Sequence, residues 1–133
     1  MKEEFTILLA DRNPHVRDLM FRELRAEGYK ILLARNGMEI LKFDDGHTNI
    51  DLLIVDLAIP DIEQASFISW LKSRMLSLPL IVHSFSSDYE AYAQTLGSAV
   101  FIEKNENSIE QLKKVVSNLL KQRDGVVHIL KQN

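Results

Sequence analysis

Residues 51–61 read Asp-Leu-Leu-Ile-Val-Asp-Leu-Ala-Ile-Pro-Asp, in which the short apolar run 51–55 is followed directly by an acid, Asp56. Its length, its branched side chains and its lack of alternation predict a strand that is covered on both faces. Four further runs of the same kind occur along the chain, at residues 6–10, 29–34, 79–83 and 99–102. The sequence therefore predicts five short buried strands.

Stretches with helical spacing separate the runs. The first has clear ends, because Asn13 suits an N-cap, Pro14 suits the first helical position and Gly28 suits a stop. Weaker patterns predict helices at about 37–43, 64–76 and 88–96, and a well-marked helix follows Asn107. Strict alternation of strands and helices predicts an α/β fold with three α/β/α layers. We expect a flavodoxin-like, five-stranded parallel sheet of order 2-1-3-4-5, with helices on both faces.

The chain has the size of one domain. Its 133 residues, 46% hydrophobic, are enough for a substantial core. We assign residues 1–123 to this domain and residues 124–133 to a C-terminal tail or linker. Asp124-Gly125 predicts a turn between the two, and residues 126–130 are a less favoured candidate for a short added strand.

Composition excludes several kinds of protein. With 16 basic and 19 acidic residues, the net charge of -3 argues against direct nucleic-acid binding. The absence of cysteine excludes disulfides, thiolate metal sites and cysteine nucleophiles. The N-terminus resembles no signal peptide, and no apolar run is long enough for a membrane span. We therefore expect a cytoplasmic protein that does not associate with a membrane.

Reactive side chains follow the predicted strands. Asp11, Asp56, Ser84 and Lys104 each lie at the carboxyl end of a different run. Ligands of open α/β sheets bind at this edge, so these four side chains are expected to meet. A carboxylate there can attack phosphorus, while a lysine and a hydroxyl hold the phosphoryl oxygens.

Four segments in order carry a family resemblance: residues 7–14, 51–61, 79–84 and 97–104. From residue 6 to about 122, the chain resembles the receiver domain of bacterial two-component response regulators. The resemblance implies a signalling domain, not an enzyme, that takes a phosphoryl group from a histidine kinase or phosphotransfer protein. It also implies signalling through the fourth helix, fifth strand and fifth helix, the face on which we expect a weak homodimer.

The resemblance assigns roles residue by residue. Asp56 matches the phosphoacceptor, and Ser84 and Lys104 match the hydroxyl and the ammonium that contact the phosphoryl group. Phe101 matches the aromatic residue that changes rotamer on phosphorylation. Asp11, Asp56 and the backbone carbonyl of Ala58 match ligands of Mg²⁺.

Four positions depart from the family pattern. Arg12 stands where the second acid of the metal-binding pair is expected, and Asn105 replaces a proline. Gln64 replaces a glycine, and Phe85 replaces a small residue beside the acceptor. With Arg12 present, two cations oppose Asp11 and Asp56, so the four charges sum to zero. We therefore predict weak Mg²⁺ binding, with Arg12 directed either at Asp56 or at solvent.

The leading hypothesis is an atypical receiver that is phosphorylated on Asp56. The alternative is a pseudo-receiver, a protein-binding module that works without phosphorylation. A small nucleotide-binding domain is a third reading, but no glycine-rich phosphate loop follows the first run.

Overall fold

The computed structural model describes the backbone of residues 4–132 and the side chains of residues 4–122. Five parallel strands form one sheet of order β2-β1-β3-β4-β5, as the sequence predicts. The strands are β1 (Thr6–Ala10), β2 (Lys30–Ala34), β3 (Leu52–Val55), β4 (Leu80–Ser84) and β5 (Val100–Glu103). The helices are α1 (Pro14–Ala26), α2 (Gly37–Lys42), α3 (Gln64–Arg74), α4 (Ser86–Tyr89), the 3₁₀ turn η1 (Glu90–Tyr92) and α5 (Ser108–Gln132).

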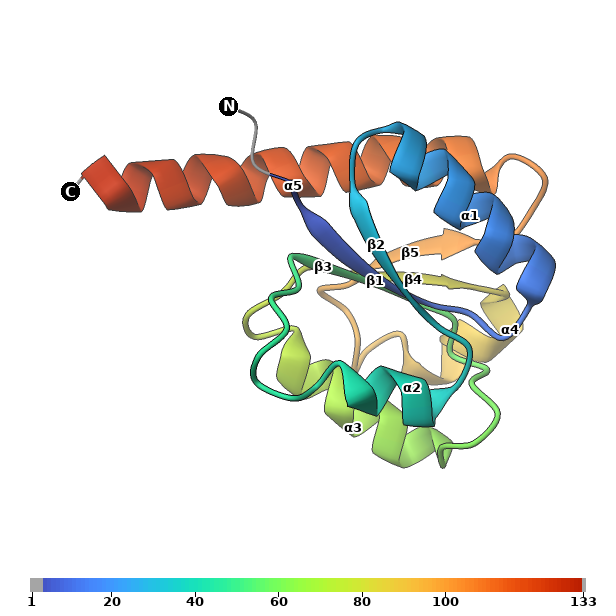
Figure 1. The fold of residues 1–133 in the computed structure, drawn as a ribbon. Helices are drawn as coiled ribbons and strands as arrows, with labels where there is room; N and C mark the ends of the chain where they lie inside the picture. The colour runs from blue at the N-terminus through green and yellow to red at the C-terminus, as the bar shows by residue number, and fades with distance from the viewer. Residues whose placement is uncertain (1–3, 133) are drawn as a thin grey trace.

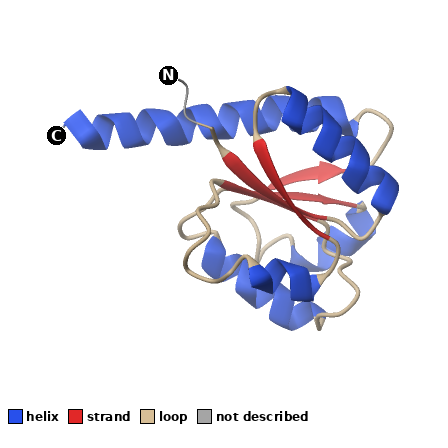
Figure 2. Cartoon of the chain, in the orientation of Figure 1, coloured by secondary structure: helices blue, strands red, loops and turns tan. Residues whose placement is uncertain are grey.

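The sheet separates two hydrophobic cores, and Figure 2 shows it between two layers of helices. In β1, Ile7 and Leu9 face the core beneath α1 and α5, while Leu8 and Ala10 face the core beneath α2 and α3. Both sets are buried because successive residues of a strand point to opposite faces. The three layers expected from the alternation of strands and helices are therefore present (Figure 1).

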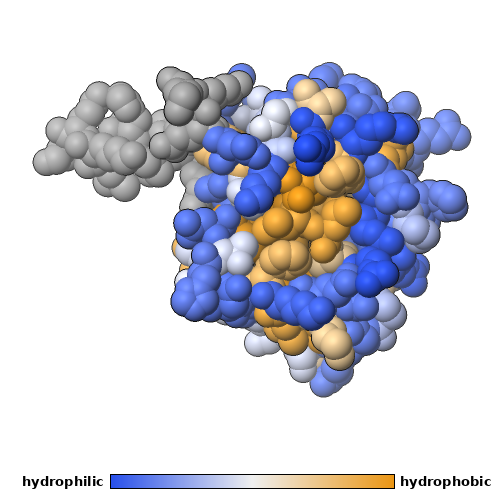
Figure 3. All heavy atoms as spheres, in the orientation of Figure 1, coloured by the Kyte–Doolittle hydropathy of each residue, from blue (hydrophilic) through white to orange (hydrophobic). Residues whose placement is uncertain are grey.

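The strand β2 forms one edge of the sheet. Its central residues Leu32 and Leu33 are only half-buried. On the face drawn in Figure 3, apolar side chains gather in the middle, between the helices of the two layers. No helix in the described part of the chain is both long and apolar enough to cross a membrane.

The helix predicted at 88–96 is shorter and begins earlier. It consists of α4 at Ser86–Tyr89 followed by the 3₁₀ turn at Glu90–Tyr92. The ring of Tyr89 stacks on Phe101, and the hydroxyl of Tyr92 donates to Gln64 Oε1 at 3.0 Å. Contacts with the sheet and with α3, rather than helix propensity, therefore fix this segment.

The turn predicted at Asp124-Gly125 and the added strand at 126–130 are both wrong. The backbone of α5 is helical from Ser108 to Gln132, and Figure 1 shows this helix continuing past the body of the domain. A single glycine inside a helix costs about 1 kcal/mol, and the chain has no proline nearby to stop the helix. The functional boundary between residues 123 and 124 stays a prediction.

Candidate functional site

The four strand-end side chains meet at one edge of the sheet. Lys104 Nζ lies 3.0 Å from Asp11 Oδ2 and 3.0 Å from Asp56 Oδ2, so it bridges the two carboxylates. Ser84 Oγ donates to Asp56 Oδ1 at 3.1 Å. Asp11 and Asp56 are each only 2% exposed, and the side chain of Lys104 is 9% exposed. The result is a buried cluster of two carboxylates, one ammonium and one hydroxyl.

Donors surround the carboxylate of Asp56. The N–H of Ala58 donates to Oδ1 at 3.0 Å, beside the hydroxyl of Ser84. The Ser84 oxygen in turn accepts from the N–H of Leu57 at 2.8 Å, which directs its hydrogen toward Asp56. Ser84 therefore both satisfies the backbone and contacts the predicted acceptor. The metal-binding role of the Ala58 carbonyl stays a prediction.

Asp11 is held by three groups. Its Oδ1 accepts from the N–H of Asn13 at 2.8 Å, and its carboxylate pairs with Lys104. Burial nevertheless raises the pKa of Asp11 above its ordinary value, because desolvation outweighs these two contacts. Arg17 Nη1 also donates to the backbone carbonyl of Asp11 at 2.7 Å. Sequence patterning missed Arg17, because its position on α1 does not show that its side chain turns back to β1.

Arg12 adopts the first of its two predicted orientations. Its Nε lies 3.9 Å from Asp56 Oδ2, and its side chain is 53% exposed. Exposure and distance make this pair weak by itself. The pair nevertheless changes the net charge of the cluster, because the positive charges of Arg12 and Lys104 together balance the negative charges of Asp11 and Asp56.

The donor set fits Mg²⁺ poorly. Within the described residues, no group of three or more histidine, cysteine, aspartate or glutamate side chains is placed to hold a metal ion. Both carboxylates already pair with Lys104, and residue 12 brings a guanidinium, which supplies no oxygen, to within 3.9 Å of Asp56. Mg²⁺ requires hard oxygen ligands in octahedral geometry and gives up its water reluctantly. Two carboxylates beside two cations do not provide that environment.

Two phenylalanines border the cluster. Phe85 is 50% exposed, and its ring centroid lies 5.8 Å from Lys104 Nζ; that the ring covers Asp56 stays a prediction. Phe101 is half-buried and stacks on Tyr89 with ring centroids 4.2 Å apart and an interplanar angle of 2°. The rings of Phe101 and Tyr89 are therefore in contact; the role of Phe101 as a switch stays a prediction.

His83 is a buried polar residue whose contacts the sequence did not reveal. It is the residue before Ser84, the last residue of β4; it is 2% exposed and places Nε2 2.9 Å from Ser108 Oγ. Burial, assisted by the charge of Lys104, lowers the pKa of His83 to about 4. The imidazole is therefore neutral at neutral pH.

Comparison with known proteins identifies the kind of domain that carries this site. The sequence profile of the family described as the response regulator receiver domain matches residues 7–117. The response regulator protein TrrA of Thermotoga maritima, solved in complex with Mg²⁺ and BeF, is 30% identical. The alignment covers 86% of this chain and 98% of that one, with a TM-score of 0.73.

Two curated relatives are longer than this chain. The response regulator GtcR of Aneurinibacillus migulanus is 28% identical over 116 residues, which cover 86% of this chain and 47% of GtcR. The CAI-1 autoinducer sensor kinase/phosphatase CqsS of Vibrio cholerae is 28% identical over 121 residues, 87% of this chain and 18% of CqsS. The chain thus spans less than half the length of either relative.

Proposed function

The chain belongs to the response regulator receiver domain family of two-component signalling, and from this membership we propose that Asp56 is its phosphoacceptor. The observation that carries the proposal is the set of donors on one carboxylate. Lys104, Ser84 and the N–H of Ala58 all lie within 3.1 Å of an Asp56 oxygen. These groups are placed to hold the oxygens of a phosphoryl group formed there.

The transfer uses Asp56 as the nucleophile. A carboxylate oxygen forms the new O–P bond as the donor's P–N bond, or its P–O bond in an acyl phosphate, breaks. The electron pair leaves with the donor's imidazole nitrogen or carboxylate. Negative charge that develops on the phosphoryl oxygens is then countered by Lys104, which lies 3.0 Å from Asp56 Oδ2.

Arg12 supplies a second positive charge in this proposal. A guanidinium matches the geometry of phosphoryl oxygens and cannot lose its proton at physiological pH. Its Nε is 3.9 Å from Asp56 Oδ2, close enough to reach a phosphoryl group on that residue after a small rotation. Because the donor set fits Mg²⁺ poorly, we assign this part of the charge compensation to Arg12.

The proposed phosphoryl donor is a histidine kinase or a phosphotransfer protein, and the proposed location is the cytoplasm. Output is assigned to protein contacts of the face made by α4, β5 and α5. Lys114 and Lys121 are exposed on α5, whereas Tyr89 and Tyr92 are half-buried and already contact Phe101 and Gln64. A weak homodimer through this face therefore depends more on the α5 lysines than on the tyrosines.

The test is chemical phosphorylation followed by intact mass measurement. The protein is incubated with acetyl phosphate, in parallel with Mg²⁺ and with EDTA. The expected result is the mass gain of one phosphoryl group, which Asp56→Asn abolishes and which EDTA reduces only modestly. An unmodified mass under both conditions would contradict the proposal and leave the pseudo-receiver as the better description.

A further inference from the structure

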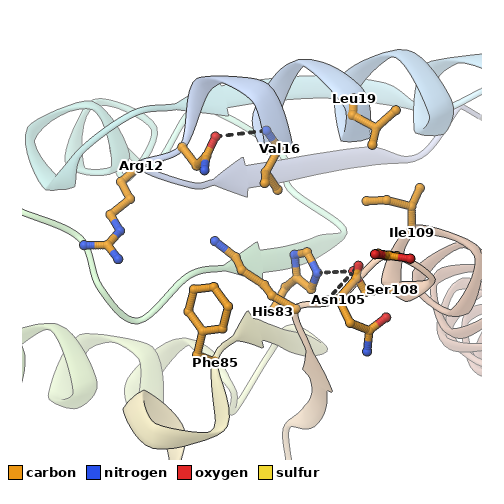
Figure 4. Close-up of a pocket in the computed structure, with 11 residues that line it drawn as sticks. Arg12, Val16, Leu19, His83, Phe85, Asn105, Ser108 and Ile109 are labelled. Atoms are coloured by element: carbon orange, nitrogen blue, oxygen red, sulfur yellow. Dashed lines mark hydrogen bonds between the residues drawn. The ribbon is translucent and has the colours of Figure 1, made fainter.

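A pocket of about 300 Å³ borders the acceptor cluster between the start of α1, the end of β4 and the loop into α5 (Figure 4). The loop that leads from β3 into α3, residues 56–63, contributes no residue to this pocket. We call it the acceptor loop, because it begins at Asp56 and carries Ala58, whose N–H donates to Asp56 Oδ1 at 3.0 Å. The position of the acceptor loop therefore sets the position of one donor on the proposed acceptor.

Asp61, in the same loop, binds the start of α2. Its Oδ1 accepts from the N–H of Gly37 at 2.5 Å, and its Oδ2 accepts from the N–H of Met38 at 3.1 Å. The first N–H groups of a helix have no acceptor within the helix. Asn36 provides an acceptor for the N–H of Glu39 at 2.9 Å, and Asp61 provides the acceptors for the two N–H groups before it. Because each carboxylate oxygen has its own donor, the carboxylate is fixed in orientation as well as in position.

The acceptor loop lies directly against α2 at this point. A Cβ added at Gly37 would lie 1.9 Å from Ile62 Cγ1, so a larger residue there requires Ile62 to move. Only Ile59 and Pro60 separate Ala58 from Asp61. The φ angle of Pro60 is fixed by its ring, and the side chain of Ile59 is buried in the core beneath α2 and α3. This short segment therefore has few free rotations with which to absorb a movement of Asp61.

We propose that Asp61 is a positioning residue for the transfer of a phosphoryl group to Asp56. By holding the acceptor loop on α2, it keeps the N–H of Ala58 directed at the acceptor. That N–H contacts Oδ1 of Asp56 in the free protein and is placed to donate to a phosphoryl oxygen during transfer. Asp61 acts through the loop and takes no part in bond making. This inference rests on the proposed function of Asp56 as the phosphoacceptor and adds one residue to it.

The test compares three variants of the full chain. Asp61→Ala removes both acceptors from α2, and Asp61→Asn keeps one of the two oxygens. Asp45→Ala is the matched control, because Asp45 is also exposed and accepts from two backbone N–H groups, those of His47 and Thr48, at 2.8 and 2.9 Å. The control therefore removes a comparable local contact that lies outside the acceptor loop.

Two quantities are measured in each variant: hydrogen exchange of the Ala58 amide by NMR, and the rate of phosphorylation by acetyl phosphate from the intact mass. Asp61→Ala should speed exchange at Ala58 about tenfold, because the loop opens more often. It should slow phosphorylation about fivefold, which is the usual worth of one hydrogen bond. Asp61→Asn should give intermediate values of both quantities, and Asp45→Ala should give native values. A purely stabilising role of Asp61 would instead lower the urea midpoint, as in Asp45→Ala, without a specific change at Ala58.

Exchange at Ala58 requires no phosphoryl group, so failure of this inference differs from failure of the proposed function. An Ala58 amide that Asp61→Ala leaves unchanged, or that Asp45→Ala changes equally, would overturn the positioning role. An unchanged rate of phosphorylation in Asp61→Ala would also overturn it. A native protein that takes no phosphoryl group would overturn the proposed function itself, on which the role of Asp61 depends.

Discussion

The substitution Arg12→Asp should convert the cluster into a better Mg²⁺ site. In the native chain Asp11 and Asp56 are balanced by Arg12 and Lys104, and the substitution changes the sum of these charges from zero to -2. At the 3.9 Å that separates Arg12 Nε from Asp56 Oδ2, two unit charges in water interact by about 1 kcal/mol. The side chain is half-exposed, so the value for water applies.

The effect on the binding of Mg²⁺ is larger than about 1 kcal/mol, because the ion carries two charges. The substitution changes the side-chain charge at position 12 by two units, so the interaction energy with the ion changes by about 4 kcal/mol before screening by salt. Salt at physiological strength halves this to about 2 kcal/mol, which corresponds to roughly 30-fold tighter binding. The new carboxylate also supplies an oxygen ligand, so this figure is a lower bound.

The assay is a Mg²⁺ titration followed by NMR at the amides of Asp11, Asp56 and Ala58. Arg22→Asp, on the exposed side of α1, changes the net charge of the protein equally and serves as the matched control. The native protein and the control should bind very weakly, and Arg12→Asp should bind at least 30-fold more tightly. Equal affinity of all three proteins would refute the charge balance as the reason for weak binding.

Three further predictions concern the same cluster. Lys104→Met removes the ammonium that two buried carboxylates share and should lower the free energy of unfolding by about 3 kcal/mol in urea titrations, with partial recovery when Asp56→Asn is added. Asp11→Asn should stabilise the protein at neutral pH, because the pKa of Asp11 is raised in the folded state. The carboxyl of Asp11 favours folding at pH values below its unperturbed pKa of 3.8, and it disfavours folding as the pH rises through its higher pKa in the folded state. The stability that Asp11→Asn gains at neutral pH should therefore vanish in thermal melts at lower pH. Phe85→Ala removes the ring 5.8 Å from Lys104 Nζ and should speed phosphorylation by acetyl phosphate about threefold; an unchanged rate would show that the ring does not limit access.

The strands and the acceptor cluster were predictable because they depend on local runs and one topological rule. Each apolar run is a strand to within one residue, and a parallel sheet brings the carboxyl ends of its strands to one edge. Asp11, Asp56, Ser84 and Lys104 therefore meet although up to 93 residues separate them along the chain.

The remaining features depend on contacts that no local pattern encodes. The shortened α4 follows from the stacking of Tyr89 on Phe101, a contact between distant segments. The orientation of Arg17 and the hydrogen bond of His83 to Ser108 are set by packing between elements. The helical end of α5 was missed because Asp124-Gly125, a strong turn signal elsewhere, is accommodated within a long helix.

The most direct test of the account is to locate the phosphoryl group. After incubation with acetyl phosphate, the protein is treated with borohydride, which reduces an aspartyl phosphate to homoserine, and peptides are sequenced by tandem mass spectrometry. We predict homoserine at position 56 alone, with Asp11 unmodified. Homoserine at another position, or aspartate recovered intact at position 56, would contradict the assignment of Asp56 as the phosphoacceptor.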